Sequence, residues 1–129
     1  MKLLLDTHLL PWAAGQSHLL SRAASELLND PDHDLLFGAA SLWEVTIKRG
    51  LGRDDFRVDP RLLRRGLLDN GYVEQPITSE HAIAAELLPP LHKGPFDRIL
   101  LAQAIVEGIT LLTSDPLLVA DYPGPVRKV

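Results

Sequence analysis

The stretch KLLLDTHLLPW, residues 2–12, places one acid directly after a run of leucines. Leu3, Leu4 and Leu5 form a short apolar run that is typical of a strand buried on both faces. Asp6 follows, and no lysine or arginine occurs in the next five positions. The stretch therefore predicts a buried strand that ends on a carboxylate. Such an ending needs a reason, because burying an unpaired charge is unfavourable.

Strand-like and helix-like segments alternate along the rest of the chain. Apolar, strand-like runs are expected at 2–5, 34–40, 72–77 and 109–115, with a further edge strand at 126–129. Segments with helical spacing or helix-start signals are expected at 19–30, 41–50, 61–71, 78–90, 95–108 and 115–122. Alternation of this kind indicates crossover units and parallel strands. We therefore predict a single α/β domain over 1–129, a three-layer sandwich with a mostly parallel central sheet of four to five strands.

The composition limits the classes of protein that remain. Of the 129 residues, 46% are hydrophobic and 23% are charged, as in ordinary globular proteins. No cysteine is present, so disulfides and thiolate metal sites are excluded and a cytoplasmic location is expected by default. No apolar run approaches the ~20 residues that span a bilayer. The net charge of −4 does not by itself favour a nucleic-acid partner.

Four acids follow or flank the predicted strands on one side. Asp6 ends the first strand, Glu44 lies one turn into the helix after the second, Asp97 opens the helix before the fourth, and Asp115 closely follows that strand. In parallel sheets, ligands bind beyond the carboxyl ends of the strands. The four acids are therefore expected at the binding edge of the sheet.

Each acid taken singly also fits a structural role. Asp6 is placed to cap a following helix, Ser41 and Glu44 have the spacing of a capping box, Asp97 lies in a first helical turn, and Asp115 precedes proline as N-caps often do. Taken together, four carboxylates in one cleft would repel unless a cation neutralised them. Oxygen ligands without cysteine suit Mg²⁺ or Mn²⁺.

A divalent ion at this edge would suit hydrolysis of a phosphodiester. The ion acidifies water and stabilises the leaving oxygen. Neighbouring side chains able to donate to a phosphate or a bound water are Thr7, Arg98, Thr113 and Ser114. His8 and His92 lie near the acids, but their spacing is not that of a helical zinc site, so we interpret them as structural. We expect His18, His33 and His81 on the surface or in loops, and Trp12 and Trp43 in the core.

Four motifs, in order, carry a resemblance to a known family. They are LLLDTHLLPW (3–12), SLWEVTIK (41–48), HKGPFDRILLAQA (92–104) and LLTSDPLL (111–118). Together they resemble the PIN domain family, and within it the VapC-type toxin ribonucleases of prokaryotic toxin–antitoxin pairs. The resemblance implies that Asp6, Glu44, Asp97 and Asp115 bind Mg²⁺ or Mn²⁺ and catalyse RNA cleavage. It also implies a homodimer and a small antitoxin protein that blocks the site.

The sequence departs from this pattern at one position. Relatives of this subgroup often have an acid two residues before the phenylalanine of the third motif, where this chain has Gly94. That acid is outside the quartet, so we expect activity to be retained, with metal affinity or substrate placement altered.

A basic segment offers a place for a polyanion despite the acidic total. Between residues 48 and 65 the chain has seven basic and three acidic residues, a local charge of +4. The seven are Lys48, Arg49, Arg53, Arg57, Arg61, Arg64 and Arg65. Three uses remain open: a phosphate-backbone footprint that includes Arg57, Arg61 and Arg64, a solvated face, or contact with an acidic tail of the antitoxin.

Other functions remain as alternatives. A haloacid-dehalogenase-like phosphatase also begins with a strand that ends on Asp, but it needs a second Asp two residues later, where this chain has His8. A receiver domain needs paired acids near the first strand, where only Asp6 is present. A PIN-like fold kept as a binding module without catalysis would be favoured by a missing acid, and the quartet is complete.

Overall fold

The computed structural model describes residues 1–89 and 94–129 and has a five-stranded parallel sheet between helices. The strands are β1 (Lys2–Leu5), β2 (Asp34–Gly38), β3 (Val73–Gln75), β4 (Thr110–Thr113) and β5 (Val126–Lys128). The α-helices are α1 (Leu9–Gly15), α2 (Arg22–Leu28), α3 (Ala39–Gly50), α4 (Pro60–Asp69), α5 (Ser79–Leu87), α6 (Pro95–Glu107) and α7 (Pro116–Asp121), and a 3₁₀ turn covers Ser17–Leu19. The strand order is β3-β2-β1-β4-β5 and every pair is parallel, which confirms the predicted fold class.

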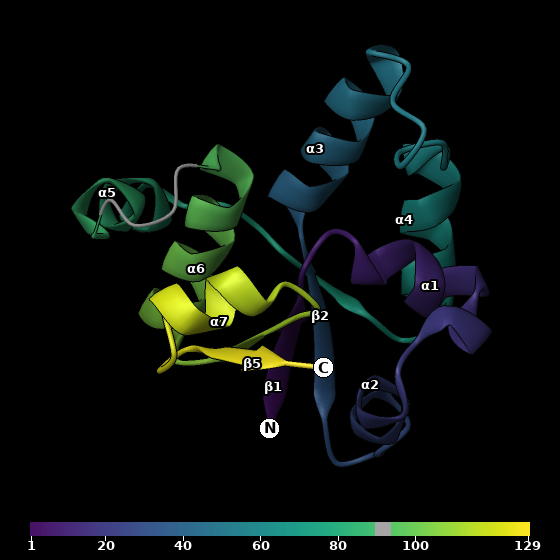
Figure 1. Ribbon diagram of the computed structural model, residues 1–129, viewed down its shortest axis with the longest axis horizontal. Helices are drawn as coiled ribbons and strands as arrows, with labels where there is room; N and C mark the ends of the chain where they lie inside the picture. Colours follow the sequence, from purple (N-terminus) through teal and green to yellow (C-terminus); the bar gives the residue numbers. More distant parts are fainter. Residues whose placement is uncertain (90–93) are drawn as a thin grey trace.

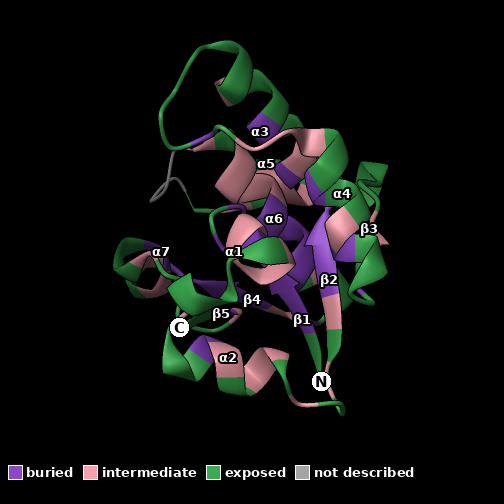
Figure 2. Ribbon diagram, turned by 90° about the vertical axis from the view of Figure 1, so that its right-hand side faces the viewer, coloured by how far each residue is buried: buried purple, intermediate pink, exposed green. Residues whose placement is uncertain are grey.

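Both faces of β1 are buried, which explains its unbroken leucines. Leu3, Leu4 and Leu5 are all 0% exposed. Successive side chains of a strand point to opposite faces. Leu3 and Leu5 accordingly pack in one apolar cluster with residues of α1 and α4, and Leu4 packs in another with residues of α6 and α7. Figure 1 shows α1, α2 and α4 on one side of the sheet and α6 and α7 on the other, and Figure 2 shows most of β1 and β2 coloured as buried.

Several helix ends follow directly from sequence signals. The Asp59 side chain accepts a hydrogen bond from the N–H of Arg61, with Pro60 at the first helical position of α4. Thr78 caps α5, and Gly108 ends α6 in the left-handed conformation that favours glycine. These boundaries confirm the sequence predictions at the same residues.

Several segments differ from the sequence predictions, and the strands expected at 72–77 and 109–115 are shorter than predicted. Helix α1 was expected only as the helix that Asp6 could cap, and no bounds were predicted for it. Its N-cap is His8 and no side chain caps it, so Asp6 does not have that role. Pro11 is tolerated in α1 because it lies in the first turn. Helix α2 is shorter than the predicted 19–30, since Ser21 caps it and a 3₁₀ turn precedes it. Helix α3 begins at Ala39, not at Ser41, so the strand expected at 34–40 ends at Gly38.

Gly38 allows α6 to approach the sheet closely. A β-carbon at this position would lie 2.9 Å from Cδ2 of Leu100 and 3.2 Å from Oε1 of Gln103. The close approach brings the amino end of α6, with Asp97, toward the carboxyl ends of the strands. In the part of the chain that the structure describes, no helix is long and apolar enough to cross a membrane.

Candidate active site

The carboxyl ends of β1 and β4 position the first acid. The N–H of Asp6 donates to the carbonyl of Leu112 at 2.9 Å, so the β1–β4 ladder continues past the end of β1 and fixes the backbone of Asp6. Its side chain is buried, with the residue 7% exposed. The two carboxylate oxygens accept hydrogen bonds from different residues: Oδ1 from the N–H of Thr7 at 2.8 Å and Oδ2 from the hydroxyl of Thr113 at 2.8 Å.

The surroundings of Asp6 disfavour its charged form. Burial, and then repulsion from Asp97, raise the pKa of Asp6 to about 6 from its ordinary 3.8. The hydrogen bonds from Thr113 and Thr7, and the nearby His8, act in the opposite direction but do not offset the first two causes. At neutral pH the charged form of Asp6 is therefore less favourable here than in water, and a cation close to it would relieve this cost.

Glu44 is the second buried acid and joins the same network. Residue Glu44 is 5% exposed, and its Oε1 accepts a hydrogen bond from the hydroxyl of Thr7 at 2.7 Å. Its Oε2 accepts one from the ammonium of Lys48, one turn later on α3. The hydroxyl oxygens of Thr7 and Ser41 lie 2.9 Å apart. The capping box considered for Ser41 and Glu44 is absent, because α3 begins at Ala39, and Oε1 of Glu44 accepts from Thr7 instead.

Asp97 and Asp115 complete the edge in different ways. Asp97 lies in the first turn of α6 and is close enough to Asp6 to raise the pKa of that group. Asp115 caps α7, since its Oδ1 accepts from the N–H of Leu117 at 2.9 Å. The N–H of Asp115 donates to the hydroxyl of Thr113 at 3.0 Å. Thr113 therefore links Asp115 to Asp6, as Thr7 links Glu44 to Asp6.

The donor set suits a hard cation in part. Asp6 and Asp97 are two carboxylates whose mutual repulsion a divalent ion would relieve, and oxygen is the ligand that such ions prefer. In residues 1–89 and 94–129, no group of three or more His, Cys, Asp or Glu side chains is arranged to hold a metal ion. Glu44 is instead paired with Lys48, and one oxygen of Asp115 is used by α7.

The remaining candidate residues lie in several places. Ser114 is exposed beside Asp115. The guanidinium of Arg98 donates to carbonyl oxygens at the end of α5, at 2.7 Å to Ala85, 3.2 Å to Leu88 and 3.2 Å to Pro89. It therefore anchors α5 in this structure, and its contact with a phosphate remains a prediction. His92 lies outside the described residues.

The basic segment is largely paired with acids. Arg57 contacts Asp54 at 2.8 Å, and Arg64 contacts Glu74 at 3.2 Å. Arg49 and Arg53 also face acids, Asp59 and Asp55, at 3.8 Å and 3.0 Å. Arg61 is exposed at the start of α4. Exposed pairs of this kind are weak, so these arginines are accessible to a stronger anion.

The burial predicted for Trp43 and the exposure predicted for His81 are both wrong. Trp43, expected in the core, is 62% exposed and packs edge-on against Phe96, with ring centroids 5.5 Å apart. His81, expected on the surface, is fully buried at the start of α5. Its Nδ1 accepts from the N–H of Thr78 at 3.0 Å, and its Nε2 lies 2.8 Å from Oε1 of Glu107. His81 thus replaces the usual Glu or Gln of a capping box.

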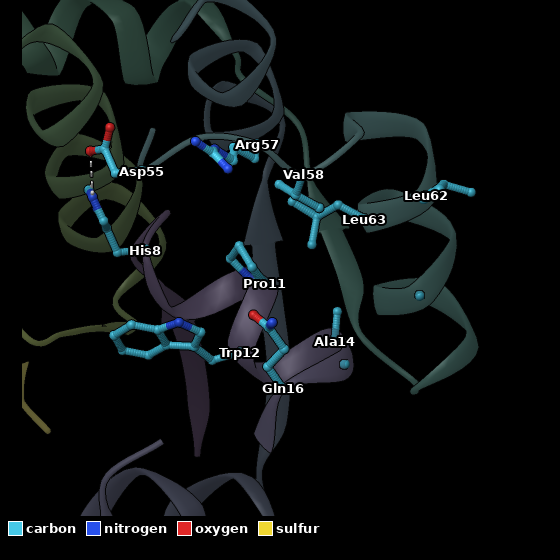
Figure 3. Close-up of a pocket in the computed structure, with 12 residues that line it drawn as sticks. His8, Pro11, Trp12, Ala14, Gln16, Asp55, Arg57, Val58, Leu62 and Leu63 are labelled. Atoms are coloured by element: carbon cyan, nitrogen blue, oxygen red, sulfur yellow. Dashed lines mark ion pairs between the residues drawn. The ribbon is translucent and has the colours of Figure 1, made fainter. Parts of the chain in front are cut away.

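A cavity of about 530 Å³ lies between α1, α4 and the loop that precedes α4. Figure 3 shows the side chains that surround it, with the ring of His8 turned toward Asp55. His8 Nε2 lies 3.8 Å from Oδ2 of Asp55, and the ring packs edge-on against Phe56. Trp12, Gln16 and Arg57 also line the cavity. None of the four acids lines this cavity, and no motif in the sequence predicted it.

The whole-chain comparison decides the family. The PIN domain model matches residues 3–120, nearly the entire chain. The chain belongs to the PIN domain family. This match confirms the resemblance drawn from the four motifs. PIN domains are a family of nucleases. None of the curated proteins matches the sequence significantly.

Solved structures share this PIN fold at low sequence identity. The structure of VapBC2 from Rickettsia felis, bound to a DNA fragment from its promoter, has a chain with a TM-score of 0.73 and 15% identity, covering 99% of this chain and 98% of that one. VapBC-1 from nontypeable Haemophilus influenzae gives 0.64 and 16%, covering 100% and 97%. A domain of a functionally unknown protein from Methanocaldococcus jannaschii gives 0.61 and 17%, covering 99% and 90%. These similarities confirm the fold.

Proposed function

We propose that this PIN domain protein is a metal-dependent endoribonuclease and the toxin of a type II toxin–antitoxin pair, active in the cytoplasm. The observation that carries the nuclease proposal is Asp6, a buried carboxylate held by Thr7 and Thr113 and facing the charge of Asp97. Membership of a nuclease family supports the same reaction. The proposed reaction adds water to phosphorus, breaks the bond to the leaving oxygen of the RNA chain, and places the released proton on that oxygen.

The four acids have different roles in this proposal. Asp6 and Asp97 would hold Mg²⁺ or Mn²⁺, with Asp115 beside them and Glu44 adding negative charge through the Thr7 network. A bound divalent ion supplies acidified water and neutralises charge on the leaving oxygen. Thr7 and Thr113 fix the orientation of both Asp6 oxygens, so that carboxylate needs little rearrangement when it binds a cation.

A cleavage assay tests the nuclease proposal. Wild-type protein should cleave total cellular RNA with Mn²⁺, and EDTA should abolish the reaction. Asp6→Asn keeps the side-chain shape and should lower the rate by a factor on the order of 10² or more, as expected when an essential metal ligand is lost. A mutant that cleaves as fast as the wild type, or a reaction that EDTA does not change, would favour a binding module without catalysis. Hydrolysis of phosphatase substrates through Asp6 would favour the phosphatase alternative instead.

The toxin role and its antitoxin rest on the motif resemblance and on the VapBC complexes that share the fold. We expect a neighbouring gene to encode a small antitoxin that co-purifies with this protein. Expression of the wild type alone should slow bacterial growth, expression of Asp6→Asn should not, and co-expression of the antitoxin should restore growth. Growth inhibition that is equal for wild type and Asp6→Asn would separate toxicity from the acid site.

A homodimer is part of the same proposal. Trp43, Ile47 and Leu51 recur every four residues on α3 and just past its end, and all three side chains are exposed. A row of exposed apolar side chains of this kind is suited to contact with a second copy of the chain. Light scattering should give twice the mass of the chain for the wild type and a lower mass for Ile47→Asp. A wild-type monomer would remove this part of the proposal.

A further inference from the structure

Lys48 is a cation built into the edge of the acid site. It lies on α3 one turn after Glu44, and its side chain is 23% exposed. A second Glu/basic pair at the same i, i+4 spacing, Arg22 with Glu26 on α2, has side chains that are 94% and 67% exposed. The spacing is common on helix surfaces, so the burial of the Lys48 pair is what distinguishes it.

Three segments of the chain hold the ammonium of Lys48. Oε2 of Glu44 accepts its hydrogen bond. The ring of Phe56, from the loop before α4, has its centroid 4.8 Å from Nζ, and the ring of Phe96, from the first turn of α6, has its centroid at 5.8 Å. Aromatic faces attract cations at these distances. Phe96 is itself packed against Trp43 and directly precedes Asp97, so the ammonium is positioned at the acid edge.

Stability alone explains this arrangement poorly. A buried ion pair usually gains little over apolar residues of similar size, because both charges must be removed from water. An ammonium carries three hydrogen-bond donors, and among the described residues Glu44 alone accepts one from Lys48. The side chain also remains partly open to solvent. The ammonium can therefore donate to an anion that enters the site while Glu44 continues to hold it.

Resting on the nuclease function proposed above, we propose that Lys48 is a catalytic residue that donates a hydrogen bond to a non-bridging oxygen of the scissile phosphate. Its charge opposes the negative charge that develops on that oxygen as water adds to phosphorus. The proton stays on Lys48 throughout. Glu44 is in this respect a positioning residue for Lys48, in addition to its contribution to the charge of the acid edge.

The test compares three variants of Lys48 with a matched control. Lys48→Met removes the charge and keeps the stem, Lys48→Gln removes the charge and keeps a donor for Glu44, and Lys48→Arg keeps the charge. Arg22→Met removes a charge from the exposed pair of the same spacing on α2, away from the acids. For each protein, kcat and KM are measured with Mn²⁺ on an end-labelled pool of random-sequence RNA oligonucleotides, and Mn²⁺ affinity is measured separately by calorimetry.

We expect Lys48→Gln and Lys48→Met to lower kcat by about 10²-fold, the effect of removing one well-placed donor, with Mn²⁺ bound at least as tightly as by the wild type. Lys48→Arg should recover part of kcat, and Arg22→Met should match the wild type. An unchanged kcat in a folded Lys48→Gln protein would overturn the proposal. So would a fall in kcat that is accompanied by an equal loss of Mn²⁺ affinity, because Lys48 would then serve only the metal site. If the wild type itself shows no Mn²⁺-dependent cleavage, the proposed function fails, and this role fails with it.

Discussion

Leu3–Leu5 and the pair Asp6–Thr7 are consecutive in the chain and similarly buried, but their chemistry is opposite. The leucines pack into the two apolar clusters on either side of the sheet. Asp6 and Thr7 belong to a group of buried polar side chains at the carboxyl edge. Among the described residues, seven polar or charged residues are buried, and five of these lie at this edge: Asp6, Thr7, Ser41, Glu44 and Thr113.

Burial has opposite effects on stability on the two sides of this boundary. Burying apolar side chains stabilises the fold, at about 25 cal/mol per Å² of apolar surface removed from water. Burying Asp6 has the opposite effect, because the raised pKa means that its charged form is less favourable in the folded protein than in the unfolded chain. The leucines of β1 therefore support the fold, while the charged form of Asp6, directly after the strand, reduces stability. Substitutions on the two sides of this boundary should behave differently.

Leu3→Ala should give the largest loss of stability. Leu3 is fully buried, and truncating a buried leucine lowers the free energy of unfolding by about 2–5 kcal/mol. Because leucine does not titrate, the loss should be similar in acid and in neutral solution. Urea unfolding at both pH values measures it. A loss that varied strongly with pH would mean that the core and the acid edge are coupled.

Asp6→Asn should raise stability at neutral pH in the absence of metal, by up to about 3 kcal/mol for a pKa raised from 3.8 to about 6. The direction of this pH dependence follows from the protonated form of Asp6. A carboxyl whose pKa is raised on folding favours the folded state fully below pH 3.8, and this contribution is lost as the pH rises through about 6. The gap between mutant and wild type should therefore open over this range and close in acid. Equal stability at all pH values would show that Asp6 is not strained by its surroundings.

Thr113→Val should have a smaller, destabilising effect of about 1–2 kcal/mol, since a buried hydroxyl that makes two hydrogen bonds is lost. The pKa of Asp6 should rise further, because the Thr113 hydroxyl favours its charged form. Thr46→Val is the matched control: Thr46 is exposed, and its hydroxyl bonds to the carbonyl of Leu42 on the same helix. If both substitutions had the same effect on stability and on the pKa of Asp6, the hydrogen bond from Thr113 to Asp6 would contribute nothing to either quantity.

Replacing Arg57, Arg61 and Arg64 together with Ala should have the smallest effect on stability. The ion pairs of Arg57 and Arg64 are exposed, and so is Arg61. RNA binding should weaken, and its dependence on salt should flatten, because fewer phosphates are neutralised. Metal-dependent stabilisation should remain. An unchanged salt slope, measured by fluorescence anisotropy on RNA, would assign the basic segment to solvation or to a protein partner.

Much of the fold could be predicted from the sequence because its signals are local. Runs of leucine identify strands, and Asp59-Pro60, Thr78 and Gly108 mark helix ends by their own conformational preferences. No bounds were predicted for helix α1, because it is short and contains proline. The start of α3 was missed because Gly38 supplies no side-chain cap, and the more familiar Ser41–Glu44 pattern pointed two residues too late.

The candidate site could be predicted as a set of acids but not as a network. The sequence predicts that Asp6, Glu44, Asp97 and Asp115 share one edge, since each follows or flanks a predicted strand on the side where parallel strands end. It does not show that Thr7 would connect Asp6 to Glu44, or that Lys48 would pair with Glu44 between two aromatic rings. Those contacts depend on side-chain directions across four separate segments. For the same reason, His81 was wrongly expected on the surface and Trp43 was wrongly expected in the core.

The most direct test of the central claim is the effect of Mn²⁺ on the melting temperature of the wild type and of Asp6→Asn. If the carboxyl edge holds a cation, saturating Mn²⁺ should raise the melting temperature of the wild type, because an ion at one hundred times its Kd stabilises the folded form by about 2.7 kcal/mol. The mutant should melt higher than the wild type without metal and should lose most of the shift. Identical melting of both proteins, with and without Mn²⁺, would contradict the account and leave the four acids as structural residues.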